Sequence, residues 1–260
     1  MTGAVKRTAK KVFEFSDNAG LLMVVGNYGS GKTEVAVNLA LGLAGRGIAT
    51  TIADLDIVNP YFRCREARQL MEEHGIRVVA PPPAMAWADL PIVVPEIKEM
   101  LHPAPGAASL FDVGGEDTGA RLLSTLVEPL DGAPYELWQV LNARRPFTST
   151  VAGCLKLKDD IENASRLRVT GLVGNTHLMA ETTPEVILEG WQLVSQVARE
   201  TGLPVKFITA MDDLADDEQL QEVKAPILRL QRYMLPPWTR PEDTPAGSQA
   251  EARAKPIGRP

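Results

Sequence analysis

The residues best suited to chemistry in this chain of 260 residues stand in the stretch GNYGSGKT, from Gly26 to Thr33. The order G-x-x-x-x-G-K-T follows an apolar run and precedes a helical pattern, which is the context in which such a loop holds phosphate. Backbone N–H groups of the loop surround a phosphate chain, and the start of the next helix adds partial positive charge. Lys32 is expected to bridge the β- and γ-phosphates, and the Thr33 hydroxyl to ligate Mg²⁺. The predicted cofactor-binding residues are therefore Gly26, Asn27, Tyr28, Gly29, Ser30, Gly31, Lys32, Thr33 and the adjoining Glu34.

Three aspartates follow two further apolar runs. Asp54 and Asp56 lie in ADLDIVNPYFR, and Asp112 lies in LFDVGGEDTG. In an open α/β sheet the carboxyl ends of the strands form the ligand site. Because side chains alternate along a strand, we expect Asp54 and Asp56 to point to opposite sides, one facing the metal or its waters and the other positioning the attacking water. Asp112 is placed for outer-sphere binding of Mg²⁺, and the glycines after it suit a turn that senses the γ-phosphate.

A later apolar run, GLVGNTHL, ends at Asn175. Its side-chain amide is both a donor and an acceptor, which suits the edge of an adenine. The guanine-selective sequence N-K-x-D is absent here. An asparagine that only forms a turn is the alternative at this position. His177 is interpreted as a turn or core histidine rather than a catalytic one.

The elements that must position these residues are read from the hydrophobic pattern. Segments of helical spacing, such as 32–47 and 183–202, separate several apolar runs. Alternating strands and helices predict an α/β fold, a doubly wound and mostly parallel sheet flanked by helices. We expect a basic N-terminal segment at 1–19, one nucleotide-binding domain at 20–235 and a flexible Pro-rich tail at 236–260. The predicted strands are 21–26, 49–54, 76–80, 108–113, 136–142, 170–175 and 204–210.

Composition excludes several classes of protein. Hydrophobic residues make up 45% and charged residues 23%, as in soluble globular proteins. The net charge of −6 offers no surplus for neutralising phosphates, so we expect no nucleic-acid partner. No apolar run approaches the roughly 18 residues of a membrane span. Two cysteines, Cys64 and Cys154, predict neither a disulfide framework nor a zinc site. We expect a cytoplasmic protein without integral membrane contact.

The P-loop, the D-x-D at 54–56 and the D-x-x-G at 112–115 together resemble the MinD/ParA/CobQ group of P-loop ATPases. That group belongs to the class that also contains the signal-recognition and nitrogenase-iron-protein NTPases. The resemblance implies ATP and Mg²⁺ as cofactors and ATP hydrolysis as the reaction. It also implies a role for each matching residue: Lys32 and Thr33 on phosphates and Mg²⁺, Asp54 beside the metal shell, Asp56 positioning water, Asp112 as the distal acid of the Mg²⁺ site, and Asn175 against the adenine.

The chain departs from this group inside the P-loop. MinD-like proteins typically read K-G-G-x-G-K-[ST], and their first lysine reaches the partner's phosphates in an ATP-sandwiched dimer. Asn27 stands at that lysine position, and Tyr28 at the following glycine. Asparagine brings no charge to the transition state, so hydrolysis by this chain alone is expected to be slow.

Arginines near the strand ends are candidates for the missing charge, as a finger in cis or from a second subunit. The alternative is that they are solvated surface residues. The candidates are Arg63 and Arg65 after the D-x-D, and Arg144 and Arg145 in NARRPFTST.

The leading functional hypothesis is an ATP-binding and ATP-hydrolysing switch whose segments 56–66 and 112–120 change with the nucleotide. It would gate a nucleotide-dependent homodimer or an unidentified client protein. An alternative is an ATP-dependent small-molecule synthetase or kinase related to dethiobiotin synthetase or the CobB/CobQ amide-forming enzymes, with an acceptor pocket at 144–150 or 81–87. A third is a nucleotide-binding scaffold without turnover.

Overall fold

A single sheet of eight parallel strands forms the centre of the protein. The computed structural model describes residues 13, 20–56, 67–80 and 95–234, without the side chains of 116–118. The strand order is β3-β2-β4-β1-β5-β6-β7-β8, and every pairing is parallel. The strands are β1 (Leu21–Gly26), β2 (Thr50–Leu55), β3 (Arg77–Val79), β4 (Ala108–Val113), β5 (Tyr135–Leu141), β6 (Gly171–Gly174), β7 (Val205–Met211) and β8 (Ile227–Leu230).

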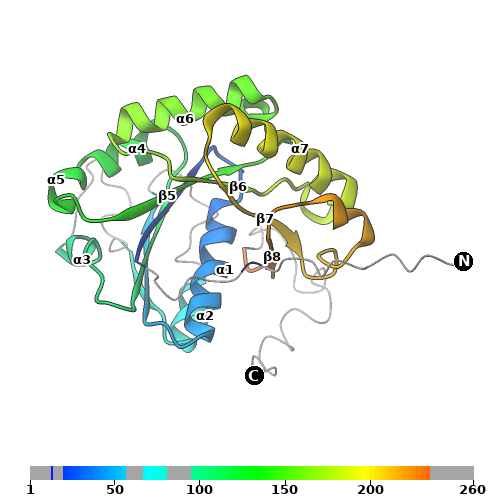
Figure 1. Ribbon diagram of the computed structural model, residues 1–260. Coiled ribbons are helices and arrows are strands. Elements are labelled where there is room, and N and C mark those ends of the chain that lie inside the picture. The colour runs from blue at the N-terminus through cyan, green and yellow to red at the C-terminus, as the bar shows by residue number, and fades with distance from the viewer. Residues whose placement is uncertain (1–12, 14–19, 57–66, 81–94, 235–260) are drawn as a thin grey trace, which may run out of the picture.

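Helices cover both faces of the sheet (Figure 1). The α-helices are α1 (Lys32–Gly45), α2 (Arg68–Glu73), α3 (Pro95–Glu99), α4 (Glu116–Ser124), α5 (Val127–Leu130), α6 (Val151–Ser165) and α7 (Pro184–Thr201). Short 3₁₀ turns occur at η3 (Pro146–Thr148), η4 (Met179–Glu181) and η5 (Glu218–Glu222). Parallel strands need crossovers, and helices on both faces bury the sheet from each side. The doubly wound α/β prediction is therefore confirmed.

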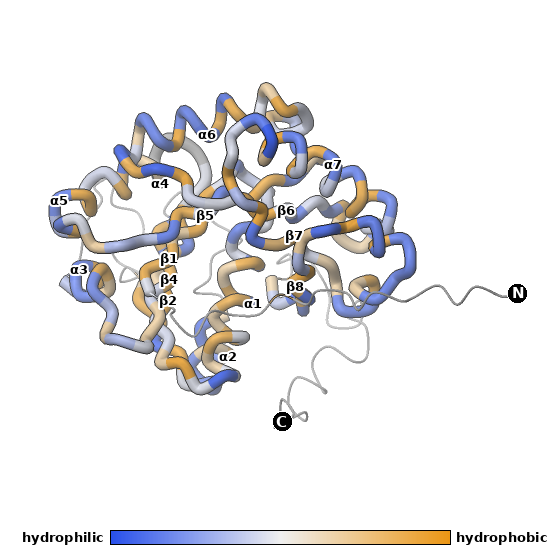
Figure 2. Tube along the Cα trace, in the orientation of Figure 1, coloured by the Kyte–Doolittle hydropathy of each residue, from blue (hydrophilic) through white to orange (hydrophobic). Residues whose placement is uncertain are grey.

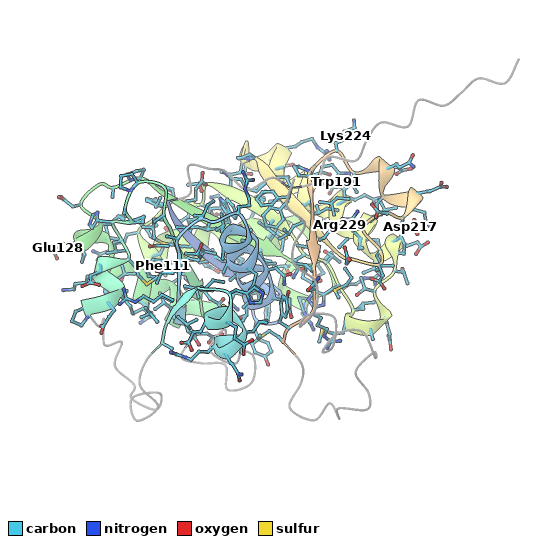
Figure 3. The ribbon with its side chains drawn as sticks, turned by 90° about the horizontal axis from the view of Figure 1, so that it is seen from below. Phe111, Glu128, Trp191, Asp217, Lys224 and Arg229 are labelled. Carbon is cyan, nitrogen blue, oxygen red and sulfur yellow. The ribbon has the colours of Figure 1, made fainter. Side chains whose placement is uncertain are left out.

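Two hydrophobic cores lie on opposite faces of the sheet. One packs the apolar sides of α1 and α2 against residues such as Val24 and Leu110. The other packs α3 to α7 against alternate residues of the same strands, such as Val25 and Phe111. Figure 2 shows the hydrophobic strands at the centre and a mixed surface on α6 and α7. In Figure 3 the ring of Phe111 lies inside the molecule, whereas Glu128 and Lys224 lie at its outside. All six residues of β4 are buried, because helices cover this central strand on both faces of the sheet.

The seven predicted strands are all present, and their ends differ from the prediction by one residue or so. The helices expected at 32–47 and 183–202 are α1 and α7. Helix α7 begins with Pro184 after Thr183 and ends at Gly202, whose φ of 71° suits glycine at a helix end. The eighth strand, Ile227–Leu230, was not predicted, because four residues give too short an apolar run to distinguish from a loop.

Several predictions fall outside the described residues. They concern the basic N-terminal segment, Arg63, Cys64 and Arg65, most of the 56–66 segment, the 81–87 acceptor pocket and the tail from 236. Among the described helices, none combines the length and the apolar character needed to cross a membrane.

Candidate functional site

The P-loop connects the carboxyl end of β1 to the first turn of α1. Gly29 and Gly31 have φ angles of 71° and 82°, in the left-handed region that favours glycine. A Cβ on Gly31 would lie 2.2 Å from Asn175 Nδ2, so a side chain has no room there. The N–H of Ser30 donates to the Asn27 carbonyl, and the N–H of Val35 donates to the Gly31 carbonyl to start the helix. The loop thus has the compact backbone that cradles phosphate.

Lys32 and Thr33 begin α1 and are both buried. Lys32 Nζ lies 3.2 Å from the position that a Cβ on Gly115 would take, and the Tyr28 nitrogen lies 3.0 Å from the same position. The glycine turn after β4 therefore packs directly against the P-loop and the lysine amine. This places the predicted γ-phosphate sensor beside the predicted phosphate-binding lysine.

The three predicted acids gather on the other side of that turn. Asp54 and Asp112 are paired in register across β2 and β4 and are fully buried. The Asp54 carboxylate accepts the Asp56 N–H at 3.0 Å. Asp56 Oδ1 lies 3.0 Å from the Cβ position of Gly114. The expectation that Asp54 and Asp56 face different sides is wrong, because residues two apart on a strand share a face and both charges act on Asp112.

Asp112 is the least satisfied polar group of the site. Neither of its carboxylate oxygens makes a hydrogen bond of normal geometry to the described residues. Burial first, and then the Asp54 charge, raise the pKa of Asp112 to about 7, while Lys32, and less strongly the Thr33 hydroxyl, oppose the rise. A buried carboxylate without a partner is costly in a folded protein. A proton or a cation from outside the chain would relieve that cost.

Mg²⁺ fits this arrangement. Within the described ranges, no three His, Cys, Asp or Glu side chains form a metal cage by themselves. Mg²⁺ at phosphate sites is commonly held by one or two protein oxygens together with phosphates and waters. Thr33 and the acids Asp54 and Asp112 supply hard oxygen ligands of that kind, next to the phosphate loop. When bound, the ion would neutralise phosphate charge.

Asn175 holds the P-loop from the end of β6, the second strand from β1 in the sheet. Its Nδ2 donates to the Ser30 carbonyl at 2.7 Å, and its Oδ1 accepts the Thr209 hydroxyl from β7. The side chain is buried. These bonds leave it one N–H and one lone pair for a base, so its first role is to fix β6, β7 and the P-loop together. Thr209 was not recognised from the sequence, because a threonine inside an apolar strand gives no motif.

Asn27 and Tyr28, the two residues that depart from the MinD-like loop, behave differently from each other. Asn27 is buried, and its Oδ1 accepts the N–H of Tyr28 at 2.8 Å. That side chain is folded back on its own loop and does not extend as a lysine would. Tyr28 is 55% exposed, so its ring stands out beside the P-loop.

Arg144 and Arg145 occupy distinct places although they are neighbours in sequence. Arg144 forms an ion pair with Glu189 on α7, at the surface. Arg145 Nε donates to the Gly29 carbonyl at 2.8 Å, so the second arginine lies on the P-loop. Burial first, and then the charges of Arg145 and Arg232, lower the pKa of His177 to about 4. His177 is therefore neutral at pH 7, in line with a structural role.

Glu34 faces the segment that follows β8. Its carboxylate accepts the N–H groups of Tyr233 and Met234 at 2.7 and 3.0 Å. One turn further along α1, Asn38 exchanges hydrogen bonds with both backbone groups of Gln231. Since the Glu34 side chain is engaged here, a nucleotide contact from this residue would use its backbone. No sequence pattern predicts this attachment, because its partners are main-chain groups.

Comparison with known proteins supports the fold. No protein-family model matches the chain, and no curated protein sequence matches it. Among solved structures it is similar to cell division protein FtsY from Thermotoga maritima, with a TM-score of 0.54 and 19% identity over 78% of this chain and 66% of that one. It is also similar to chloroplast FtsY from Physcomitrella patens, with a TM-score of 0.50 and 22% identity over 77% and 61%.

A third similar structure is the signal recognition particle receptor FtsY from Elizabethkingia anophelis in complex with GDP. Its TM-score is 0.50 and its identity 17%, over 75% of this chain and 58% of that one. The chain spans less than two thirds of each of these three proteins. The likeness establishes the α/β fold of P-loop NTPases for this chain.

Proposed function

We propose that this chain is a Mg²⁺-dependent ATP-binding and ATP-hydrolysing switch that acts on a partner protein. The observation that carries the proposal is the buried carboxylate of Asp112, which makes no hydrogen bond of normal geometry to the described residues and is in register with Asp54 and with Val24 of β1. A metal–phosphate complex supplies the positive charge and the ligand oxygens that this arrangement lacks. Lys32 binds the phosphates, and Asp56 orients water for hydrolysis.

ATP is proposed over GTP from the residues around Asn175. Guanine recognition requires a carboxylate for the base N–H groups, as in N-K-x-D. The three residues after Asn175 are Thr176, His177 and Leu178, which offer no carboxylate. His177 is neutral at pH 7 and thus adds no charge at this place.

Exposed apolar side chains support a partner at the same edge. In the described part of the chain the exposed large hydrophobic residues are Tyr28, Phe147, Leu178 and Met179. They follow β1, β5 and β6, which are neighbours in the sheet. Phe147 is 71% exposed. Exposed apolar side chains at one edge of the sheet are typical of a protein contact surface.

Calorimetric titration of ADP, ATP, GDP and GTP, with and without Mg²⁺, tests the nucleotide site. We expect ATP and ADP to bind more tightly than the guanine nucleotides, and ATP to require Mg²⁺ for full affinity. Lys32→Ala should lose about 2–5 kcal/mol of binding free energy, since it removes one partner of a buried charge contact. Equal affinity of wild type and Lys32→Ala would overturn the proposal, as would the absence of nucleotide binding.

Light scattering with ADP and with a non-hydrolysable ATP analogue tests the switch. We expect a change from monomer to dimer only with the ATP analogue, and its loss in Phe147→Ser with nucleotide affinity retained. An unchanged mass for the wild type would remove the homodimer from the proposal. The synthetase alternative stays a prediction, tested by small carboxylic acids that stimulate ADP release.

A further inference from the structure

The guanidinium of Arg145 lies directly against the P-loop. It comes from the loop after β5, and its Nε donates to the Gly29 carbonyl at 2.8 Å. A Cβ on Gly29 would lie 2.8 Å from Nε and 3.0 Å from Cζ. The guanidinium therefore packs directly on the Gly29 backbone, and the glycine is required for that approach.

The remaining nitrogens of this guanidinium are available for a ligand. Arg145 is half-buried and forms no ion pair with any carboxylate among the described residues. The adjacent Arg144 shows the contrast, because it is exposed and paired with Glu189. A half-buried arginine with one hydrogen bond to a carbonyl retains four N–H donors and two flat faces.

The strand order indicates which part of a bound nucleotide would lie near Arg145. Strands β4 and β2, which carry the three acids, lie on one side of β1, whereas β5 and β6 lie on the other. Arg145 follows β5, and Asn175 follows β6. Arg145 is thus on the side of β1 away from the acids.

Two further side chains contact the P-loop on the same side as Arg145. His177 Nε2 lies 3.2 Å from the Cβ position of Gly31, and Asn175 Nδ2 holds the Ser30 carbonyl. Arg145 is close enough to His177 for its charge to lower the pKa of that imidazole. Arg145, His177 and Asn175 thus surround one side of the P-loop.

We propose that Arg145 contacts the face of the nucleotide base and contributes affinity for the nucleoside part of the ligand. It is then not the cation that replaces the missing lysine at the γ-phosphate. Guanidinium groups stack on aromatic faces, with contributions that correspond to about two- to thirtyfold in affinity. The inference rests on the proposed nucleotide site and names the part of the nucleotide that this side of it recognises.

The experiment compares wild type, Arg145→Ala and the matched control Arg144→Ala. Affinities are measured for ADP, for a non-hydrolysable ATP analogue and, by competition against a fluorescent nucleotide, for inorganic tripolyphosphate, all with Mg²⁺. For Arg145→Ala we expect about two- to thirtyfold weaker binding of both nucleotides, by the same factor. Tripolyphosphate affinity and kcat at saturating ATP should match the wild type, and KM should rise. Arg144→Ala should match the wild type throughout.

Three results would overturn the inference. Weaker tripolyphosphate binding in Arg145→Ala would assign the residue to the phosphates or to the shape of the loop. A lower kcat with nucleotide affinity retained would make it a hydrolytic finger, and unchanged nucleotide affinity would leave it no role in binding. Failure of the proposed function is recognised separately, because then the wild type itself binds no nucleotide or binds it as tightly as Lys32→Ala does.

Discussion

The two sides of β1 differ in how their polar groups are satisfied. On the acid side, formed by the ends of β2 and β4, Asp112 is fully buried with no normal hydrogen bond to the described residues. On the cationic side, formed by the loops after β5 and β6, Asn175 has two protein partners and Arg145 one. The cationic side is held together by the chain's own contacts, whereas the acid side carries a buried carboxylate that a cation or a proton would neutralise.

The two sides therefore differ in whether their geometry depends on a bound ligand. A hydrogen-bonded scaffold keeps its geometry without ligand, because opening it would leave buried polar groups unpaired. Carboxylates packed together are instead a cost that a metal ion or a proton relieves. The acid side is therefore where we expect ligand to change stability most, and the cationic side is where we expect the fixed geometry of the binding edge.

The largest expected effect tests the acid side through hydrolysis. Asp56→Ala should lower kcat about 100- to 1000-fold while nucleotide affinity stays near the wild type, since positioned proton-transfer groups contribute about that much. Single-turnover hydrolysis and calorimetric titration check the two parts. The control is Asp213→Ala, an exposed aspartate after β7. An equal loss of binding and hydrolysis would contradict the role given to Asp56.

A pH titration of stability tests the cationic side. The pKa of His177 is about 4 in the folded protein and about 6.5 in the unfolded chain. The unfolded state therefore takes up a proton first as pH falls, and stability is lost between about pH 6.5 and 4. A shift of this size corresponds to about 3 kcal/mol. Burial first, and then the nearby charges of Arg145 and Arg232, keep the imidazole neutral.

Urea unfolding of His177→Gln at pH 7.5 and pH 4.5 measures that loss. The variant should lose less stability than the wild type between the two pH values, by an amount approaching 3 kcal/mol. His102→Gln, at an exposed histidine, is the matched substitution for comparison. If His177→Gln loses as much stability between the two pH values as the wild type, His177 is not the group whose protonation opposes folding.

The sequence predicted the acid side better than the cationic side. The P-loop and the three aspartates lie in short motifs with a fixed spacing, directly after apolar runs, so their position at the sheet edge follows from the strand pattern. Which sides Asp54 and Asp56 face was predicted wrongly, because the period of two was misapplied.

The cationic side depends on contacts between residues far apart in sequence. Arg145 was one of four candidate arginines, and only the strand order β1-β5-β6 shows that it lies away from the acids. The bond from Thr209 to Asn175 joins residues 34 positions apart, and the attachment of Tyr233 to Glu34 uses main-chain N–H groups. Periodicity and motifs carry no signal for such pairs.

A smaller effect, on thermal stability, distinguishes Asp112 from Asp54 on the acid side. In the metal-free protein Asp112→Asn should raise stability by about 1–3 kcal/mol, because it removes a buried carboxylate that lacks a partner beside Asp54. It should also abolish the gain in nucleotide affinity that Mg²⁺ gives. Asp54→Asn is the matched variant, and it should not stabilise the protein, since Asp54 accepts the N–H of Asp56. Thermal unfolding with and without Mg²⁺ measures both, and destabilisation by Asp112→Asn would show that its charge is satisfied without metal.

The smallest effect concerns the segment that carries Arg232. Asn38 holds the backbone of Gln231 through a donated and an accepted hydrogen bond, so Asn38→Ala should cost about 1–2 kcal/mol of stability. Arg232 is one residue further along, close enough to act on His177. A looser segment should therefore weaken ATP and ADP binding a few-fold while the Mg²⁺ dependence and kcat stay as in the wild type. Chemical denaturation and calorimetric titration test this, and a change in Mg²⁺ dependence would show that the two sides of β1 are coupled through α1, the helix that bears both Asn38 and Lys32.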